Sequence, residues 1–161
     1  MRHEYLSVYN LKSDTINVDT INVGGGGYLT KTHNFATDGH VCASHTLFNI
    51  SGVVRFKIIP VCITSLAGGG VGNQVSLGYN GAATAIIAET TGTQIDAGEI
   101  WMSSVDAAIA KEKATSLVLD RVAAGYTTIR MQITSASTST GKIQFHLWWE
   151  PILAGSKVTV A

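Results

Sequence analysis

Charged side chains are scarce in this sequence of 161 residues. They make up 14% of the chain, against roughly 25% in a typical soluble protein, whereas apolar residues make up 45%. Lys and Arg together number 11, and so do Asp and Glu. Because the chain has no net positive charge, we do not expect it to bind nucleic acid or an anionic membrane. The low charge content also indicates that other protein covers part of the surface.

Long apolar runs and cysteines are also few. No run approaches the ~18 to 20 residues of a membrane helix, and the first ten residues lack the apolar core of a signal peptide. We therefore expect a soluble protein synthesised in a cytoplasm. The chain contains two cysteines, Cys42 and Cys62, which are too few for a disulfide framework. We interpret them as two small buried residues rather than as a pair.

Alternating apolar residues dominate the segment from Thr127 to Pro151, around which we expect the domain to be organised. Period-two alternation is typical of strands with one buried face. A small, polar segment at 135–141 separates the two runs, so we interpret them as a hairpin. The predicted buried residues of this hairpin are Ile129, Met131, Ile133, Ile143, Phe145, Leu147 and Trp149.

Further short β-patterned segments precede this one. Asn80-Gly81 predicts a tight hairpin, and Pro60 predicts a bend, a bulge or a sheet edge within a strand. Only residues 105–116 have a helix-forming composition, and 154–161 could add an edge strand. The total of about eight to ten strands predicts an all-β fold, an antiparallel β-sandwich or a jelly-roll-like barrel.

The first 27 residues are expected to form an extended arm ahead of a sandwich domain at 28–161. The sequence DTINV occurs twice in tandem, at 14–18 and 19–23. Because five is odd, an unbroken strand would turn the apolar residues of the two copies to opposite faces. A turn or bulge could reset the register, or the segment could be a loose terminus. We favour an arm lying between neighbouring subunits, with contacts made by Ile16, Val18, Ile21 and Val23.

Four consecutive glycines, Gly24 to Gly27, follow this repeat. Their backbone freedom predicts a hinge or a tight passage. A phosphate-binding loop would require a helix immediately afterwards, and the residues that follow favour β-structure. We therefore expect no phosphate or nucleotide cofactor here.

A metal site is the first candidate for chemistry. His33, His40, Cys42 and His45 carry zinc-compatible side chains, and His40 and Cys42 would share one face of a strand. His45 would point to the opposite face, and this region contains no second ligand pair at a finger-like spacing. We therefore interpret these histidines as ordinary strand and loop residues and predict no metal site.

Asp96 and Glu99 lie close to Trp101, as a carboxylate pair and an aromatic platform would in a glycosidase. The same segment is also typical of a turn that leads into a core tryptophan, which we favour. The chain contains no G-x-S-x-G, P-loop or dinucleotide fingerprint. We predict no catalytic residues and no enzyme.

Trp148 and Trp149 are adjacent, so one ring should enter the core and the other should lie on the outer face of the sheet. An outward ring suits a subunit interface better than an isolated surface. We therefore add Trp148 to the predicted contact residues.

Three motifs in the body of the chain resemble those of small virion proteins from tailed bacteriophages, often encoded near the major capsid protein. They are a C-x-T-x-L strand end, an I-D-A-x-E-I-W segment and a W-x-P strand end, and the match covers roughly Val53 to Val160. The first 35 residues depart from the pattern. The matching residues are Cys62, Thr64, Leu66, Ile95, Asp96, Ala97, Glu99, Ile100, Trp101, Trp149 and Pro151.

The resemblance implies a virion structural protein, a capsid decoration or cementing protein or the base of a head fibre. Such proteins are commonly β-rich trimers, so the implied partners are other copies of the chain and the major capsid protein, at the capsid surface. A tail or head-fibre module that binds host-surface glycans through Trp101 or Trp148 is the alternative. A carbohydrate-active enzyme using Asp96 and Glu99 is more remote.

Overall fold

β-Strands make up most of the computed structural model, which describes residues 21–23, 26–39, 42–68, 72–102, 120–134 and 138–161. These residues form ten strands and one short 3-10 turn, η2 (Gly92–Gln94), and contain no α-helix. Accordingly, no helix within these ranges has the length and apolar character needed to span a bilayer. The predicted helical segment at 105–116 lies outside the described residues.

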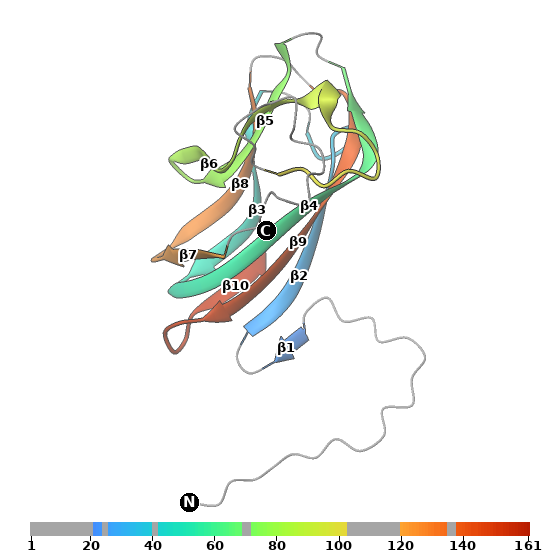
Figure 1. Cartoon of the computed structure of the whole chain (residues 1–161). Helices are drawn as coiled ribbons and strands as arrows, with labels where there is room; N and C mark the ends of the chain where they lie inside the picture. The colour runs from blue at the N-terminus through green and yellow to red at the C-terminus, as the bar shows by residue number, and fades with distance from the viewer. Residues whose placement is uncertain (1–20, 24–25, 40–41, 69–71, 103–119, 135–137) are drawn as a thin grey trace, which may run out of the picture.

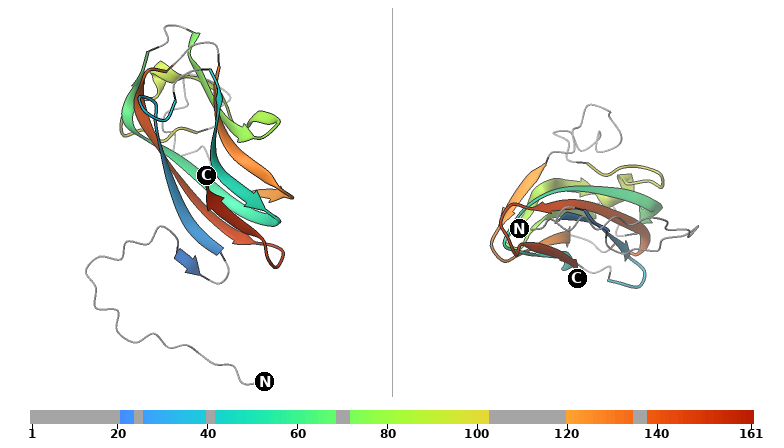
Figure 2. Two further views of the ribbon diagram at one scale, coloured as in Figure 1. Left: turned by 180° about the vertical axis from the view of Figure 1, so that it is seen from behind. Right: turned by 90° about the horizontal axis from the view of Figure 1, so that it is seen from below.

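The strands form two antiparallel sheets that pack face to face (Figures 1 and 2). In spatial order, the first sheet contains β1 (Ile21–Val23), β2 (Gly26–Asn34), β9 (Thr140–Pro151), β4 (Val53–Ala67) and β7 (Arg121–Ala124). The second contains β10 (Lys157–Val160), β3 (Ser44–Ser51), β8 (Thr127–Thr134), β5 (Gln74–Tyr79) and β6 (Ala82–Thr91). The predicted all-β sandwich is confirmed.

The core lies between the two sheets and is built from alternate residues of each strand. β9 buries Ile143, Phe145 and Leu147 from one side, and β8 buries Ile129 and Met131 from the other. Each such side chain contributes about 1.5 to 3 kcal/mol when it is fully removed from water. The alternation in the sequence therefore correctly identified the buried faces of β8 and β9.

The predicted hairpin between β8 and β9 is wrong, because these strands belong to different sheets. β8 pairs with β3 and β5, whereas β9 pairs with β2 and β4. The polar segment between them therefore connects the two layers instead of closing a hairpin. Alternation specifies which face of a strand is buried, but two strands can bury those faces side by side or across a core.

Two other predictions from the sequence are confirmed. Asn80 and Gly81 form the turn between β5 and β6, and Gly81 has a φ of 84°, as a two-residue hairpin requires. The C-terminal residues form β10, which lies at the edge of the second sheet and pairs with β3.

Pro60 lies within β4, and the strand continues through it. Its Cα partner on β9 is Phe145, while its carbonyl oxygen points the other way and accepts a hydrogen bond from Trp101 N at 3.0 Å. Since N and C=O of one residue point to the same side, the missing donor faces away from β9. β7 pairs only with Val53–Phe56, so Pro60 occupies an edge of the regular sheet, as one of the predicted alternatives required.

Part of the run Gly24 to Gly27 belongs to a strand, which corrects the interpretation of the whole run as a hinge. Gly26 and Gly27 are the first residues of β2, and Gly27 is paired with Trp149. A Cβ on Gly26 would lie 2.4 Å from Trp149 O, so close backbone packing requires glycine here. The division into an arm at 1–27 and a body at 28–161 stays a prediction.

Candidate functional site

The two outer faces of the sandwich differ in chemistry. On the second sheet, polar side chains bond to one another: Arg130 Nε donates to Thr46 Oγ1 at 3.2 Å, and Arg130 Nη1 donates to Asn80 Oδ1 at 3.1 Å. Thr134 Oγ1 likewise donates to Glu89 Oε1 at 3.1 Å. These polar groups therefore already have hydrogen-bond partners within the sheet.

The outer face of the first sheet instead carries an aromatic cluster. Register places Tyr28 on β2 beside Trp148 on β9, and their ring centroids are 4.9 Å apart. The His146 ring stacks 6.0 Å from Tyr28, and its Nδ1 is hydrogen-bonded to the Tyr28 hydroxyl. We call Tyr28, His146 and Trp148 the aromatic face.

Partial burial lowers the pKa of His146 from its ordinary value of 6.5. The imidazole is therefore mainly neutral at pH 7, and the aromatic face carries no charge of its own. A neutral ring with one apolar face and one polar edge is suited to protein contact, since covering it requires no ion to be desolvated.

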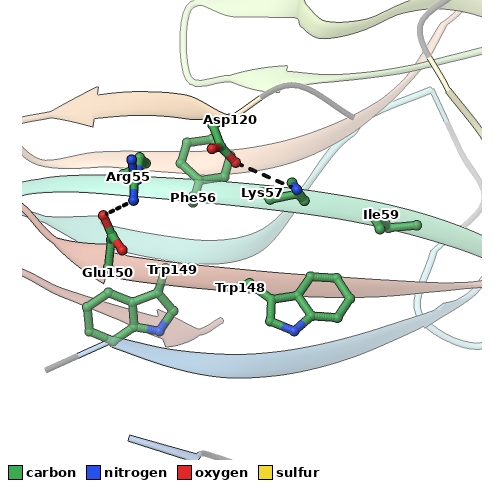
Figure 3. Close-up of a pocket in the computed structure, with 8 residues that line it drawn as sticks. All are labelled: Arg55, Phe56, Lys57, Ile59, Asp120, Trp148, Trp149 and Glu150. Carbon is green, nitrogen blue, oxygen red and sulfur yellow. Dashed lines mark ion pairs between the residues drawn. The ribbon is translucent and has the colours of Figure 1, made fainter. Parts of the chain in front are cut away.

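An open pocket of about 390 Å³ lies beside the aromatic face (Figure 3). Two ion pairs line it, Arg55–Glu150 with 2.6 Å between Nη2 and Oε1, and Lys57–Asp120 with 3.8 Å between Nζ and Oδ1. All four charged side chains are about half exposed, so each pair contributes little to folding. The remaining lining residues are Phe56, Ile59, Trp148 and Trp149.

The expected division between the two adjacent tryptophans is confirmed. Trp149 packs against the core, whereas Trp148 is 43% exposed on the outer face. Trp148 is thus a large apolar ring with paired charges on one side and Tyr28 on the other. Aromatic anchors surrounded by polar groups are typical of protein interfaces.

The predicted arm contacts lie next to this surface where the structure describes them. Ile16 and Val18 lie outside the described residues. Ile21 and Val23 belong to β1, whose backbone pairs with the start of β2, with Ile21 opposite Tyr28. The second DTINV copy therefore ends at the edge of the sheet that bears the aromatic face.

Two motifs that carry the phage-protein resemblance meet in space. Residues 95–101 run along the free edge of β4, which we call the 95–101 connection. Cys62 N donates to Glu99 O at 2.8 Å, and Leu66 N donates to Ile95 O at 3.1 Å. Ala97 N also donates to Ser65 Oγ at 3.0 Å. The C-x-T-x-L and I-D-A-x-E-I-W motifs therefore form one structural unit that extends the sheet.

The favoured interpretation of Trp101 as a core residue is confirmed, because only 1% of its surface is exposed. Its Nε1 donates to Thr90 Oγ1 at 3.1 Å. A buried ring cannot stack on a sugar, so the glycan platform proposed at Trp101 is wrong. Glu99 Oε2 accepts a hydrogen bond from Asp96 N at 2.8 Å, which closes the turn before Trp101.

The two cysteines are both free, and only one is buried, which corrects the expectation for Cys42. Cys62 Sγ donates to Thr64 O at 3.2 Å. Burial first, and then the charges of Glu99 and Asp96, raise its pKa to about 11, so the thiol stays protonated and unreactive at neutral pH. Cys42 is exposed because β3 begins only at Ser44, after the predicted strand position.

The histidine cluster is only partly assembled. The rings of His33 and His45 are 4.7 Å apart between centroids, and His33 Nε2 donates to Gly39 O at 3.0 Å. Cys42 precedes β3, so it does not share a strand face with His40 as predicted, and His40 itself is outside the described residues. Within the described ranges, no three His, Cys, Asp or Glu residues are grouped to hold a metal ion.

The aromatic face includes two residues, Tyr28 and His146, that the sequence did not single out. His146 and Trp148 alternate with the buried residues of β9, which is the signal that could have identified an aromatic outer face. Comparisons with protein-family models, curated proteins and solved structures find no match for this chain. Function must therefore be inferred from the surface itself and from the motifs.

Proposed function

We propose that this protein is a structural component of a tailed-phage virion that binds the outer capsid surface as a homo-oligomer and stabilises the head. The observation that carries the proposal is the aromatic face, in which a partly exposed Trp148 packs beside Tyr28 and His146 on the outer face of the first sheet. Such an anchor gains free energy when a partner covers it, because the ring then leaves water.

The motifs of the phage-protein resemblance support this proposal through their position. Two of the three motifs lie where β4 meets the 95–101 connection, and their side chains pack in the core or close the turn before Trp101. A protein whose most distinctive residues maintain its shape fits a structural role. The resemblance also implies that the protein is a trimer and that its partner in the virion is the major capsid protein.

The arm extends the proposed contact surface. Ile16, Val18, Ile21 and Val23 would contact the capsid or a neighbouring subunit together with Trp148, because β1 joins the sheet beside Tyr28. A protein that spans subunit junctions stabilises a shell, since dissociation must then break the additional contacts as well.

Cosedimentation with empty expanded tailed-phage capsids tests the proposal. The intact chain should saturate the shells, and Trp148→Ala should weaken binding by about tenfold or more, as the loss of an aromatic anchor does. Ile63→Ala is the matched control, because Ile63 is 49% exposed on β4 but outside the aromatic face, and it should bind normally. Deleting residues 1–20 should also weaken binding.

Failure of the intact chain to bind any such capsid would refute the proposal. If the Trp148→Ala chain and the intact chain bound capsids equally well, the aromatic face would not contribute to capsid binding. Unchanged capsid binding and oligomeric state after the deletion would remove Ile16 and Val18 from the contact set.

A head-fibre module that binds host-surface glycans is the second candidate. The exposed Trp148 ring beside a pocket with two ion pairs favours it, since stacking and polar contacts together recognise sugars. Saturable binding to cell-surface glycans that Trp148→Ala abolishes, with no capsid binding, would establish this candidate instead.

A further inference from the structure

The tip of the β5–β6 hairpin carries the only Asn-Gly dipeptide of the sequence, Asn80-Gly81. The hairpin stands out from the body of the sandwich (Figures 1 and 2), and both residues of the dipeptide are exposed. A Cβ added to Gly81 would meet nothing within 4 Å, so the turn is open to water. Water and base therefore have access to the asparagine whose neighbour has no side chain.

An asparagine deamidates when the backbone nitrogen of the next residue attacks its side-chain carbonyl carbon. At Asn80, the bond from Gly81 N to Cγ forms and the Cγ–Nδ2 bond breaks. The proton of Gly81 N passes through water to Nδ2, which leaves as ammonia, and a second water opens the cyclic imide to aspartate or isoaspartate. A side chain on the following residue hinders this attack, and glycine has none. The chain has seven asparagines, and the other six are followed by Leu, Val, Val, Phe, Ile or Gln.

Two hydrogen bonds hold Asn80 in the folded turn. Arg130 Nη1 donates to Asn80 Oδ1 at 3.1 Å, and Asn80 N donates to Thr128 O at 3.2 Å. Arg130 is itself held in place, because its Nε donates to Thr46 Oγ1 at 3.2 Å. The side chain and the backbone of Asn80 are therefore both fastened to β8, the central strand of the second sheet.

The hydrogen bond from Arg130 has two opposite effects on this reaction. A cation bonded to Oδ1 draws electrons from Cγ and favours attack, whereas the same bond fixes the side chain and opposes ring closure. The imide ring requires the side chain of Asn80 to fold back over its peptide bond to Gly81, away from β8. Because the hydrogen bond must open before the nitrogen attacks, the free energy of that opening slows the reaction. The holding effect therefore outweighs the activation.

We propose that Asn80 is the deamidation site of this protein and that Arg130 is the positioning residue that slows the reaction. As aspartate, the product places a carboxylate beside the Arg130 guanidinium. As isoaspartate, it adds a carbon to the backbone of a two-residue turn, whose length sets the register between β5 and β6. The inference does not depend on the proposed function.

Peptide mass spectrometry of the full chain, sampled during incubation at mildly alkaline pH, tests the proposal. Asn80 should lose its amide before the other asparagines, and Arg130→Met should speed this loss at least about fivefold, because a charged donor no longer opposes opening of the turn. The matched control is Arg121→Met, which should deamidate at the rate of the intact chain. Arg121 donates to Ala85 O at 2.9 Å and to Ile86 O at 3.0 Å, so it bonds to the same hairpin but at other residues.

Arg130→Lys is the second variant, in case the first does not fold. It keeps the charge but lacks the planar fork that bonds to Thr46 and Asn80 together, so it should also deamidate faster than the intact chain. Earlier amide loss at another asparagine would overturn the assignment of the site. Equal or slower loss at Asn80 without Arg130, or equal acceleration by Arg121→Met, would overturn the role of Arg130. Urea denaturation should show that each variant is folded.

Discussion

At the scale of single residues, the three tryptophans have different roles. Trp101 is buried, Trp149 packs against the core with part of its ring exposed, and Trp148 lies on the outer face. Strand alternation predicts the difference between positions 148 and 149, because neighbouring side chains point to opposite faces. Trp101 had two possible interpretations in the sequence, and only packing against the core decided between them.

Trp101→Ala should reduce the free energy of unfolding by about 3 to 5 kcal/mol, the usual cost of removing a large buried ring. The substitution leaves a cavity beside β4 and removes the donor to Thr90 Oγ1. Urea denaturation followed by circular dichroism measures the loss. Trp148→Ala is the control and should cost about 1 kcal/mol or less, mainly the packing with Tyr28. Equal losses would contradict the placement of the two rings.

Folding stability should decrease as pH falls below about 6.5, where an unfolded histidine becomes protonated. Burial first, and then the nearby His45, lower the pKa of His33 in the folded protein, although its hydrogen bond to Gly39 and the charge of Asp38 oppose this. In the window between the folded and unfolded pKa values, the unfolded chain binds more protons, so acid favours unfolding. The stabilisation is complete above the unfolded pKa of 6.5.

Urea midpoints between pH 5 and pH 8 measure this dependence. His33→Gln should flatten the profile because the titrating group is removed. His146→Gln is the comparison, since burial also lowers the pKa of His146 and the two contributions should be separable. A profile that is equally steep without His33 would contradict the assignment.

At the scale of elements, β4 shows how one strand uses its two edges differently. One edge pairs with β9 along most of its length, while the other pairs with β7 only at Val53–Phe56. Beyond that point, residues 95–101 take the free edge, with Val61 bridged to Ile100. The sequence indicated an edge through Pro60, but it could not identify the segment that covers it, since that segment lies more than thirty residues away.

Gly26→Ala should weaken the packing of β2 on β9. The new Cβ would lie 2.4 Å from the backbone oxygen of Trp149, which cannot rotate away, and overpacking typically costs about 1 to 3 kcal/mol. Urea denaturation measures the effect. Thr32→Ala, at an exposed position of the same strand, is the control and should change stability by about 0.5 kcal/mol or less. A neutral Gly26→Ala would contradict the close approach of the strands.

At the scale of the whole molecule, the described core runs from Leu29 to Val158. Deleting residues 1–20 removes none of these side chains, so the sandwich should keep its stability, with an unfolding free energy within about 1 kcal/mol of the intact chain. Thermal and urea unfolding of the truncated chain measure this. Loss of the cooperative transition would show that the first 20 residues belong to the folding unit.

Alternation in the sequence determined the fold class, the buried face of most strands and the outward position of Trp148, and the Asn80-Gly81 dipeptide determined the β5–β6 turn. These features are local, because they depend on backbone geometry over a few residues and on which side chains avoid water. The contact roles of the arm residues and Trp148 stay predictions. Only the tertiary structure decided that β8 and β9 lie in opposite layers, that Tyr28 and His146 join Trp148, and that residues 95–101 cover the free edge of β4. Strand order depends on which distant segments of the chain pack together. Several choices of neighbouring strand bury the same apolar area, so the alternation of apolar residues along the sequence does not distinguish between them.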